Sequence, residues 1–330
     1  MNKAKWILYF GLILFLGVQI FLYFNGFFTD RLKPLSIPLS DSFTGNILFT
    51  GDTSGAFDLA SCERFGSLSR RSALLNKFGE YLYVDTGNFT SENPTINTRT
   101  LMLFAQAYRY MNLSAMNITK RDLIALADAN APNMGAHFVS ANLEIHTPEN
   151  LKNAVSTFRL IPLTLKRGKE ARRIMIGVTG ITHNERQLHD DKVQFTITAI
   201  ENSLAEVLKS LEQADIKILL FNESYFTLKR LIMQDKLKFD LIIARATLPD
   251  QENRVEYINH IPVVFPSEYG RSLGYIRVSQ TNSKFKFDFN AFDLGMGAPL
   301  DKNMETISRA IRIKIREKSA PKTTSGVKTP

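Results

Sequence analysis

A polar loop directly after an apolar run is the first stretch of this sequence that could carry chemistry. The run Ile47-Leu48-Phe49 is typical of a buried strand, Gly51-Asp52 turns out of it, and Ser54 lies two residues after the aspartate. In many metal hydrolases the corresponding loop reads Asp-x-His, and both side chains bind one ion. Here the second position is serine, so the loop is either a metal site with altered ligands or a site without metal.

Other polar residues follow further short apolar runs. Asn88 comes after "YLYVDTG", Asp122 after "LSAMNITKR" and Glu223 after "IKILLFN". In layered α/β folds the functional side chains lie in loops at the carboxyl ends of the strands. These loops are therefore the candidate site.

The elements that must position these loops alternate along the chain. Short apolar runs such as "ILFT", "YLYV", "RIMIGVTGIT" and "IKILLFN" predict buried strands, and "RRSALLNKF", "TLMLFAQAYRYMNL" and "SLAEVLKSLEQA" have helical spacing. The later segments "IPVVFPSEYGRSLGYIRVSQ" and "KFKFDFNAFDL" predict antiparallel strands joined by turns. This alternation predicts an α/β layered domain over residues 45–300, followed by a helix over 301–318 and a disordered basic tail over 319–330.

The N-terminus predicts a membrane anchor over residues 1–28. Residues 6–24 form an apolar run whose only polar residue is Gln19, which is long enough to cross a bilayer as a helix. Lys3 and Lys5 precede it and no small-x-small cleavage site follows, so we expect an uncleaved anchor with a cytoplasmic N-terminus. A linker over 29–44 contains two prolines.

Charge and cysteine content exclude two classes of function. Most of the net charge of +9 resides in Lys3, Lys5 and the basic residues after 308, so the domain between is near neutral and we expect no nucleic-acid partner. A single cysteine, Cys62, excludes an internal disulfide and a Cys-rich zinc site. The five histidines lack paired metal-binding spacing, and "HNERQLHDD" is interpreted as a solvated polar loop, with a loop metal site as the alternative.

The order of these segments resembles the N-terminal domain of the 5'-nucleotidase and UDP-sugar hydrolase family, a calcineurin-like metallophosphoesterase domain. "ILFTGDTSGAF" resembles its opening Asp-x-His loop, "GSLSRRSALLNKF" its Gly-Gly-x-Ala-Arg-Arg helix start, and "YLYVDTGNFT" its strand ending in Gly-Asp. "FVSANL" and "VVFPSEYGRSLGYIRV" resemble two later segments. The resemblance implies a sandwich of mixed sheets flanked by helices. Cys62 lies just ahead of the "GSLSRR" helix start, where a bacterial subgroup of the family has a Cys-x-Cys motif, and the first position of that motif is Ala60 here.

The resemblance also implies that most ligands of the family's two-metal site are absent. Asp52 matches the first aspartate, Ser54 replaces a histidine and Asn88 replaces the bridging aspartate. The remaining positions are Lys120, Arg121 and Asp122 in place of Asn-His-Glu, and Glu223, Ala246 and Leu248 in place of three histidines. We therefore expect no cofactor, or at most one divalent cation held by oxygens of Asp52, Asp122 and Glu223. Otherwise Asp52 braces a loop and the other two carboxylates face solvent.

Two functions remain open from the sequence. One is an inactive binding or scaffold domain, whose unknown partner is a protein or an anion held by Lys120 and Arg121. The alternative is an active 5'-nucleotidase-like hydrolase with a reorganised single-metal site. In either case the resemblance and the anchor predict a single-pass protein of the bacterial inner membrane, which contacts lipid through residues 6–24 and faces the periplasm.

Overall fold

The computed structural model describes residues 42–55, 68–91, 101, 104–129, 137–183, 191–248, 250–295 and 297–319. The predicted anchor and Cys62 lie outside these residues, as do the linker up to residue 41 and the tail from residue 320. Among the residues described, no helix is both long and apolar enough to cross a membrane.

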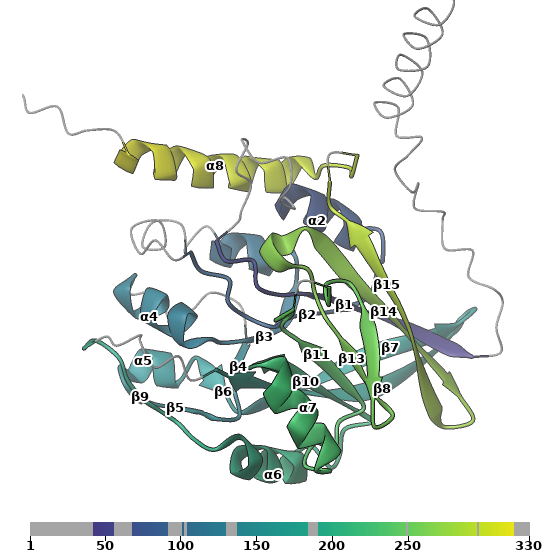
Figure 1. The fold of residues 1–330 in the computed structure, drawn as a ribbon. Helices are drawn as coiled ribbons and strands as arrows, with labels where there is room; N and C mark the ends of the chain where they lie inside the picture. The colour runs from purple at the N-terminus through teal and green to yellow at the C-terminus, as the bar shows by residue number, and fades with distance from the viewer. Residues whose placement is uncertain are drawn as a thin grey trace, which may run out of the picture. The chain divides into compact units, whose positions relative to one another are not determined.

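Within the described residues, thirteen strands form one hydrogen-bonded sheet, and eleven of them follow one another in a single path (Figure 1). Its order is β12 (Val255–Ile258), β13 (Ile261–Val264), β11 (Leu241–Ala244), β10 (Ile216–Asn222), β8 (Glu170–Thr182), β7 (Phe158–Arg167), β1 (Phe43–Thr50), β2 (Leu82–Asp85), β3 (Leu113–Asn117), β4 (Phe138–Val139) and β6 (Val155–Ser156). β14 (Ser272–Thr281) also pairs with β1, and β15 (Lys284–Asp293) pairs with β14. A separate pair joins β5 (Leu143–Thr147) and β9 (Gln194–Ile197).

The path folds into two sheets that pack face to face. A single residue pair, Thr44 with Lys166, joins β1 to β7. Successive side chains along each strand point to opposite faces of its sheet, so they pack in different cores. Ile218 and Leu220 of β10 contribute to a central core that also contains Ile47 of β1, whereas Leu219 contributes to an outer one. The strands therefore carry apolar residues on both faces, which explains their unbroken apolar runs.

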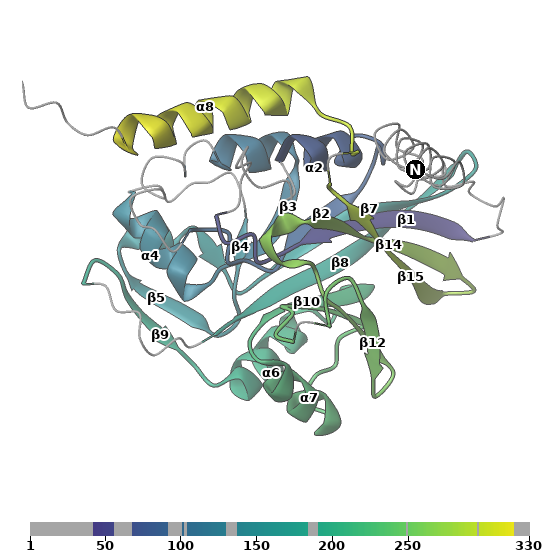
Figure 2. The ribbon, with the colours of Figure 1, turned by 45° about the horizontal axis from the view of Figure 1, so that its top comes forward.

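Helices cover the outer faces of both sheets, as Figure 2 shows. α2 (Leu68–Leu75), α4 (Lys120–Asp128) and α8 (Lys302–Ser319) bury side chains in one outer core, and α6 (Ile200–Ser210) and α7 (Tyr225–Met233) in the other. Two short helices are α5 (Glu149–Lys152) and the 3-10 turn η1 (Glu268–Gly270). The layers are thus helix, sheet, sheet, helix, which confirms the predicted α/β sandwich with mixed sheets.

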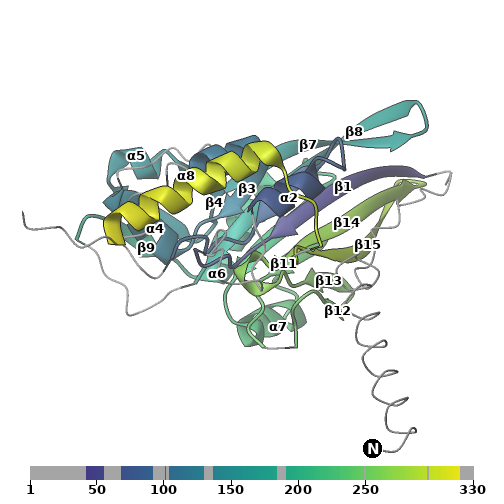
Figure 3. The same ribbon diagram turned by 90° about the horizontal axis from the view of Figure 1, so that it is seen from above.

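The C-terminal helix α8 lies along α2 (Figure 3). Asp301 precedes it and accepts hydrogen bonds from Ser72 at 2.7 Å and Asn76 at 2.9 Å. Met304 is fully buried, and Ile307 packs partly buried against the same core. The first half of α8 therefore packs on the domain as an ordinary terminal helix.

Parallel pairing brings the candidate loops to one edge. β1, β2 and β3 are parallel neighbours in one sheet, and β8, β10 and β11 in the other. Two buried asparagines join the carboxyl ends of the two sheets. Asn117, at the end of β3, donates to the Ile181 carbonyl at 2.8 Å, and Asn222, at the end of β10, donates to the Thr86 carbonyl at 3.3 Å.

Candidate functional site

The loop after β1 is bonded to the loop after β2. Asp52 N–H donates to the Gly87 carbonyl at 3.0 Å, and Ser54 N–H donates to the Asn88 carbonyl at 2.8 Å. Gly87 has φ +86, and a Cβ there would lie 2.3 Å from the Asn117 carbonyl oxygen, so only glycine fits this close approach. The glycine bend places Asn88 beside Asp52 and Ser54.

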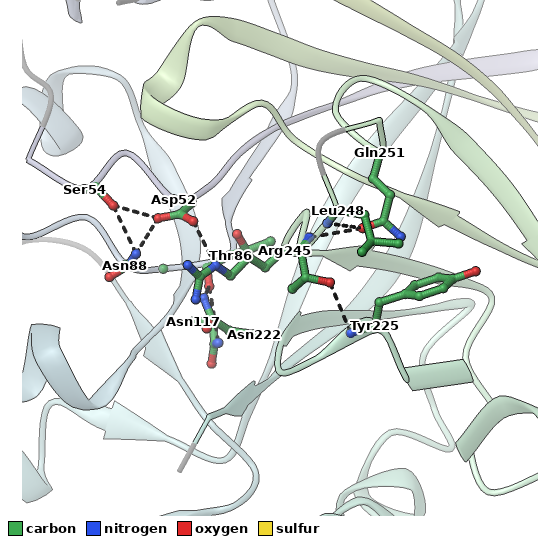
Figure 4. Close-up of polar contacts among 12 residues, drawn as sticks. Asp52, Ser54, Thr86, Asn88, Asn117, Asn222, Tyr225, Arg245, Leu248 and Gln251 are labelled. Carbon is green, nitrogen blue, oxygen red and sulfur yellow. Dashed lines mark hydrogen bonds and ion pairs between the residues drawn. The ribbon is translucent and has the colours of Figure 1, made fainter. Parts of the chain in front are cut away.

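Asp52 is the centre of a compact polar cluster (Figure 4). Its Oδ1 accepts hydrogen bonds from Ser54 Oγ at 2.7 Å and from Asn88 Nδ2, and Asn88 Nδ2 also lies 3.1 Å from Ser54 Oγ. Its backbone carbonyl accepts from Tyr269 N–H of η1 at 2.8 Å. The residue is 5% exposed. The structure thus brings together Asp52, Ser54 and Asn88 from two different loops.

Arg245, directly after β11, completes this cluster. Its Nε lies 2.8 Å from Asp52 Oδ2 and forms an ion pair with the carboxylate. The Arg245 side chain is 34% exposed, and the Asp52 side chain 7%. Sequence reasoning missed Arg245, because it considered only the neighbouring positions that match the family's histidines. The available signal was a charged residue at the end of the apolar run "FDLIIA".

A second acidic residue, Glu268 of η1, contributes to the electrostatics of this region. Burial raises the pKa of Glu268, and the negative charges of Asp52 and Glu252 raise it further, against the lowering effect of Arg245. Arg245 therefore pairs with Asp52 and, together with Arg271, opposes the rise in the pKa of Glu268.

The residues present do not fit a metal ion at Asp52. Both carboxylate oxygens already accept hydrogen bonds from the chain itself, and one of the donors carries a full positive charge. Asn88 presents its amide N–H₂ to the carboxylate, while its Oδ1 is buried without a hydrogen-bond partner. A divalent cation would have to displace the guanidinium and tolerate its repulsion. Within the described ranges no group of three or more His, Cys, Asp or Glu side chains is arranged to hold an ion.

Asp122 is a structural residue at the start of α4. Thr119 is the N-cap, and Thr119 and Asp122 form a reciprocal capping box. Asp122 also accepts from Asn88 N–H at 2.8 Å and from Thr90 N–H at 3.0 Å. Burial raises the pKa of Asp122, although hydrogen bonds from Thr119 and Thr90 oppose that shift. The expectation that Asp122 faces solvent is wrong, because the side chain holds two loops to the helix.

Glu223 is paired with His183. The Glu223 side chain is 15% exposed, so the expectation that it faces solvent is also wrong. Its Oε2 contacts His183 Nδ1, and its Oε1 accepts from Ser224 N–H at 2.9 Å. Burial opposes the ionised form, but the hydrogen bonds from His183 and Ser224 outweigh it and lower the pKa of Glu223.

The histidine half of this pair begins the polar stretch that was expected to be a solvated loop. His183 follows β8, its side chain is 39% exposed, and it contacts Glu223. Asp191 is exposed, and the rest of that polar stretch, including His189, lies outside the described residues. His183 could not be placed from spacing alone, because its partner is 40 positions away in sequence.

Ala246 and Leu248 contribute no polar atom from their side chains. Ala246 is 4% exposed within the outer core under α7, and Leu248 is 38% exposed. The backbone N–H groups of Thr247 and Leu248 donate to Gln251 Oε1 at 3.0 and 3.1 Å, which fixes the turn (Figure 4). The Gln251 side chain therefore holds the shape of the loop that follows Arg245.

Lys120 and Arg121 open α4. Lys120 is 5% exposed, and its ammonium lies 5.5 Å from the centroid of the Phe195 ring on β9. Arg121 is partly exposed. The Lys120 charge is therefore directed in part toward an aromatic face.

A buried polar network lies under the site. Thr50 Oγ1 donates to Asp85 Oδ2 at 2.5 Å and contacts the Tyr83 hydroxyl at 2.8 Å, while Arg71 Nη1 lies 3.4 Å from that hydroxyl. Gly87 N–H donates to Asp85 Oδ1 at 2.8 Å. Burial raises the pKa of Asp85 to about 6, against the lowering effects of Thr50 and Arg71. Sequence reasoning did not identify this network.

Comparison with known proteins agrees with this architecture. No protein-family model matches the chain, and no curated protein matches it in sequence. The 5'-nucleotidase precursor from Thermus thermophilus has a similar structure, with a TM-score of 0.67, 15% identity, and coverage of 83% of this chain and 59% of that one. The calcineurin-like phosphoesterase YfkN from Bacillus subtilis gives 0.60 and 19% identity over 84% of this chain and 98% of that one.

A third similar structure is the sulfate thiohydrolase SoxB from Thermus thermophilus, with a TM-score of 0.63, 14% identity, and coverage of 82% of this chain and 61% of that one. The chain thus spans about three fifths of the length of SoxB and of the Thermus 5'-nucleotidase precursor. Identities this low establish the fold alone. The described domain has the calcineurin-like metallophosphoesterase fold, as the resemblance in its sequence predicted.

Proposed function

We propose that this chain is a membrane-anchored, extracytoplasmic binding or scaffold protein that uses a metallophosphoesterase fold without phosphoester chemistry. The observation that carries the proposal is the Asp52–Arg245 ion pair. Asp52 is the one residue that matches a metal ligand of the family, and an internal cation occupies its Oδ2. The positive charge that a metal would supply at this carboxylate comes instead from the chain.

The competing proposal is a hydrolase with a single reorganised metal site. It requires Asp52, Asp122 and Glu223 to share one ion. Each of these carboxylates has its own separate partners, which are Arg245, the Thr119 cap and His183. Breaking such buried interactions leaves unsatisfied polar groups, and this cost opposes metal capture.

The ligand that we propose for the loops around Asp52 and Arg121 is a protein or an anion. Structurally similar proteins include 5'-nucleotidases, so a phosphate-bearing ligand is consistent with the neighbours' chemistry. Arg121 and the partly exposed guanidinium of Arg245 are the groups at these loops suited to a phosphate or carboxylate. The anchor over residues 6–24 and a periplasmic location remain part of this proposal.

Metal content and turnover test the proposal directly. The full chain is purified in detergent without chelators, its Mn, Zn, Fe, Mg and Ca are assayed, and AMP, UDP-glucose and a bis-aryl phosphate are offered with added Mn²⁺. We expect far less than one metal per chain, and the same background turnover in the wild type and in Asp52→Ala. Near-stoichiometric metal with turnover that disappears in Asp52→Ala would overturn the proposal.

A further inference from the structure

One end of the domain carries a concentration of basic side chains. The β7–β8 hairpin reads Lys-Arg-Gly-Lys-Glu-Ala-Arg-Arg around its turn, and the β14–β15 turn adds Lys284. We call these basic residues and the acidic residues beside them the basic end. All of its side chains are exposed, and they are Lys166, Arg167, Lys169, Arg172, Arg173, Lys284, Glu80 and Glu170. Six basic residues less two acidic ones give this end a net charge of +4.

The acidic residues neutralise only part of this charge. Lys166 pairs with Glu80 at 3.1 Å, and Arg167 pairs with Glu170 at 2.7 Å. For Lys169, Arg172, Arg173 and Lys284 the part of the chain that the structure describes contains no ion pair. These four side chains form an exposed cationic surface, and the two acidic residues do not neutralise their positive charge.

The basic end coincides with the point where the chain enters the domain. Phe43, the first residue of β1, pairs with Gln280 near the β14–β15 turn, and the Arg167 guanidinium lies 4.5 Å from the centroid of the Phe43 ring. Figures 1 and 3 show the β7–β8 hairpin, the start of β1 and the β14–β15 turn at one end of the domain. Whatever precedes residue 42 is therefore joined covalently to the basic end.

The length of the preceding segment sets how far this end can lie from a membrane. The predicted span ends at Phe24, and 18 residues separate it from Phe43. A chain of that length spans at most about 65 Å when it is fully extended. Connectivity therefore sets only an upper limit on the distance between the basic end and the headgroups, and the charges act once that distance falls to about the screening length of 8 Å.

We propose that the basic end binds the anionic phospholipid headgroups of the membrane that holds the anchor. Guanidinium and ammonium groups bind phosphate oxygens, and each basic residue near an anionic surface strengthens association by about fivefold. The candidate site follows Thr50 at the other end of β1, roughly 23 Å along the strand from Phe43. Lipid binding at the basic end directs the candidate site away from the bilayer.

Fluorescence quenching in vesicles tests this orientation with the full chain. A probe is attached at Ala171→Cys, in the exposed hairpin, or at Phe226→Cys, on α7 beyond the carboxyl end of β10, each in a Cys62→Ser background. The protein is reconstituted in phosphatidylcholine vesicles with or without about one third phosphatidylglycerol, with a headgroup quencher. We expect phosphatidylglycerol to increase quenching at residue 171 but not at 226, and high salt to remove the increase.

Two matched variants separate a specific surface from net charge. The first changes Lys169, Arg172, Arg173 and Lys284 to Gln, and the second changes Lys209, Lys229, Lys236 and Lys238, which are also exposed, to Gln. We expect only the first to lose the phosphatidylglycerol-dependent quenching. Equal quenching in both lipids, or equal loss in both variants, would overturn the proposal.

If the purified chain does not insert into the vesicles, flotation measures whether it binds to their surface. Flotation with phosphatidylglycerol vesicles alone, reduced about fivefold per neutralised residue in the first variant, supports the proposal without an anchor. Flotation with neither vesicle overturns it. The inference rests on the anchor in the proposed function, but neither result depends on metal content or turnover, so the proposed loss of phosphoester chemistry is tested separately.

Discussion

Two carboxylates on either side of Asn88 have opposite environments. Asn88 N–H donates to Asp122, and the Asn88 side-chain amide donates to Asp52. Asp122 is fully buried and is held by neutral donors from Thr90, Thr119 and Asn88. Asp52 is 5% exposed and is paired with the Arg245 cation, whose side chain is one third exposed.

The difference teaches that a carboxylate's role depends on its partners more than on its position in a motif. Both residues occupy places where the sequence suggested a possible ion. Neutral donors and deep burial make Asp122 a brace between loops and helix. A cation from a distant strand makes Asp52 one half of an ion pair. Variants that remove each set of partners test this contrast.

The largest expected effect is at Asp122. Asp122→Ala removes the capping box and leaves the N–H groups of Asn88 and Thr90 without their acceptor, so we expect a loss of about 3–5 kcal/mol in the free energy of unfolding. Urea unfolding of the full chain measures it. The exposed Asp191→Ala is the control, with an expected change below about 0.5 kcal/mol. A loss near the control value would show that Asp122 is not a brace.

The next effect concerns pH and Asp85. Its pKa in the folded protein is about 6, above the ordinary value of 3.8, so its protonated form is favoured by folding. Protonated Asp85 therefore contributes about 3 kcal/mol to the free energy of unfolding below pH 4, and this contribution is lost as pH rises through 6. The raised pKa of Asp122 acts in the same direction, whereas the lowered pKa of Glu223 acts in the opposite one.

Comparing unfolding free energies of the wild type and Asp85→Asn between pH 4 and 7 isolates this contribution. The difference between the two proteins should change steadily across that range, because Asn does not titrate. A difference independent of pH would mean that Asp85 ionises normally in the folded protein.

The smallest of the three effects is at Arg245. Arg245→Ala leaves the Asp52 charge with two neutral donors, and because a third of the Arg245 side chain is exposed we expect a loss of about 2 kcal/mol. A double-mutant cycle with Asp52→Asn should give a coupling of about 1–2 kcal/mol. Additive single variants would show that the ion pair contributes nothing and would remove the distinction drawn between Asp52 and Asp122.

The layered α/β fold could be predicted because its strands are buried on both faces. β11 is wholly apolar, and β1 and β10 contain the apolar runs Ile47–Phe49 and Ile218–Phe221, which are visible without knowledge of the strands' partners. β7 was missed because Pro162 and polar residues interrupt its pattern. Pairing with β8 along its whole length stabilises it, and local sequence does not report that pairing.

The candidate site could be predicted only in part for a related reason. Asp52, Ser54 and Asn88 lie in loops that the resemblance made easy to find. Arg245 and His183 are the partners that decide the chemistry, and they come from distant strands at positions where the family's motif gives no ligand. Which side chains meet across the two sheets depends on the order of the strands, and local patterns in a single sequence do not reveal that order.

β1 has a mechanical consequence, because it links the chain's entry point to the candidate site. Its antiparallel ladder with β14 has seven residue pairs, and its parallel ladder with β2 has four. Ladder hydrogen bonds lie across the strand, so tension applied at Phe43 along β1 loads them together in shear. Force applied at Phe43 must therefore break both ladders before it displaces Asp52, so the Asp52–Arg245 ion pair keeps its geometry while β1 is under tension.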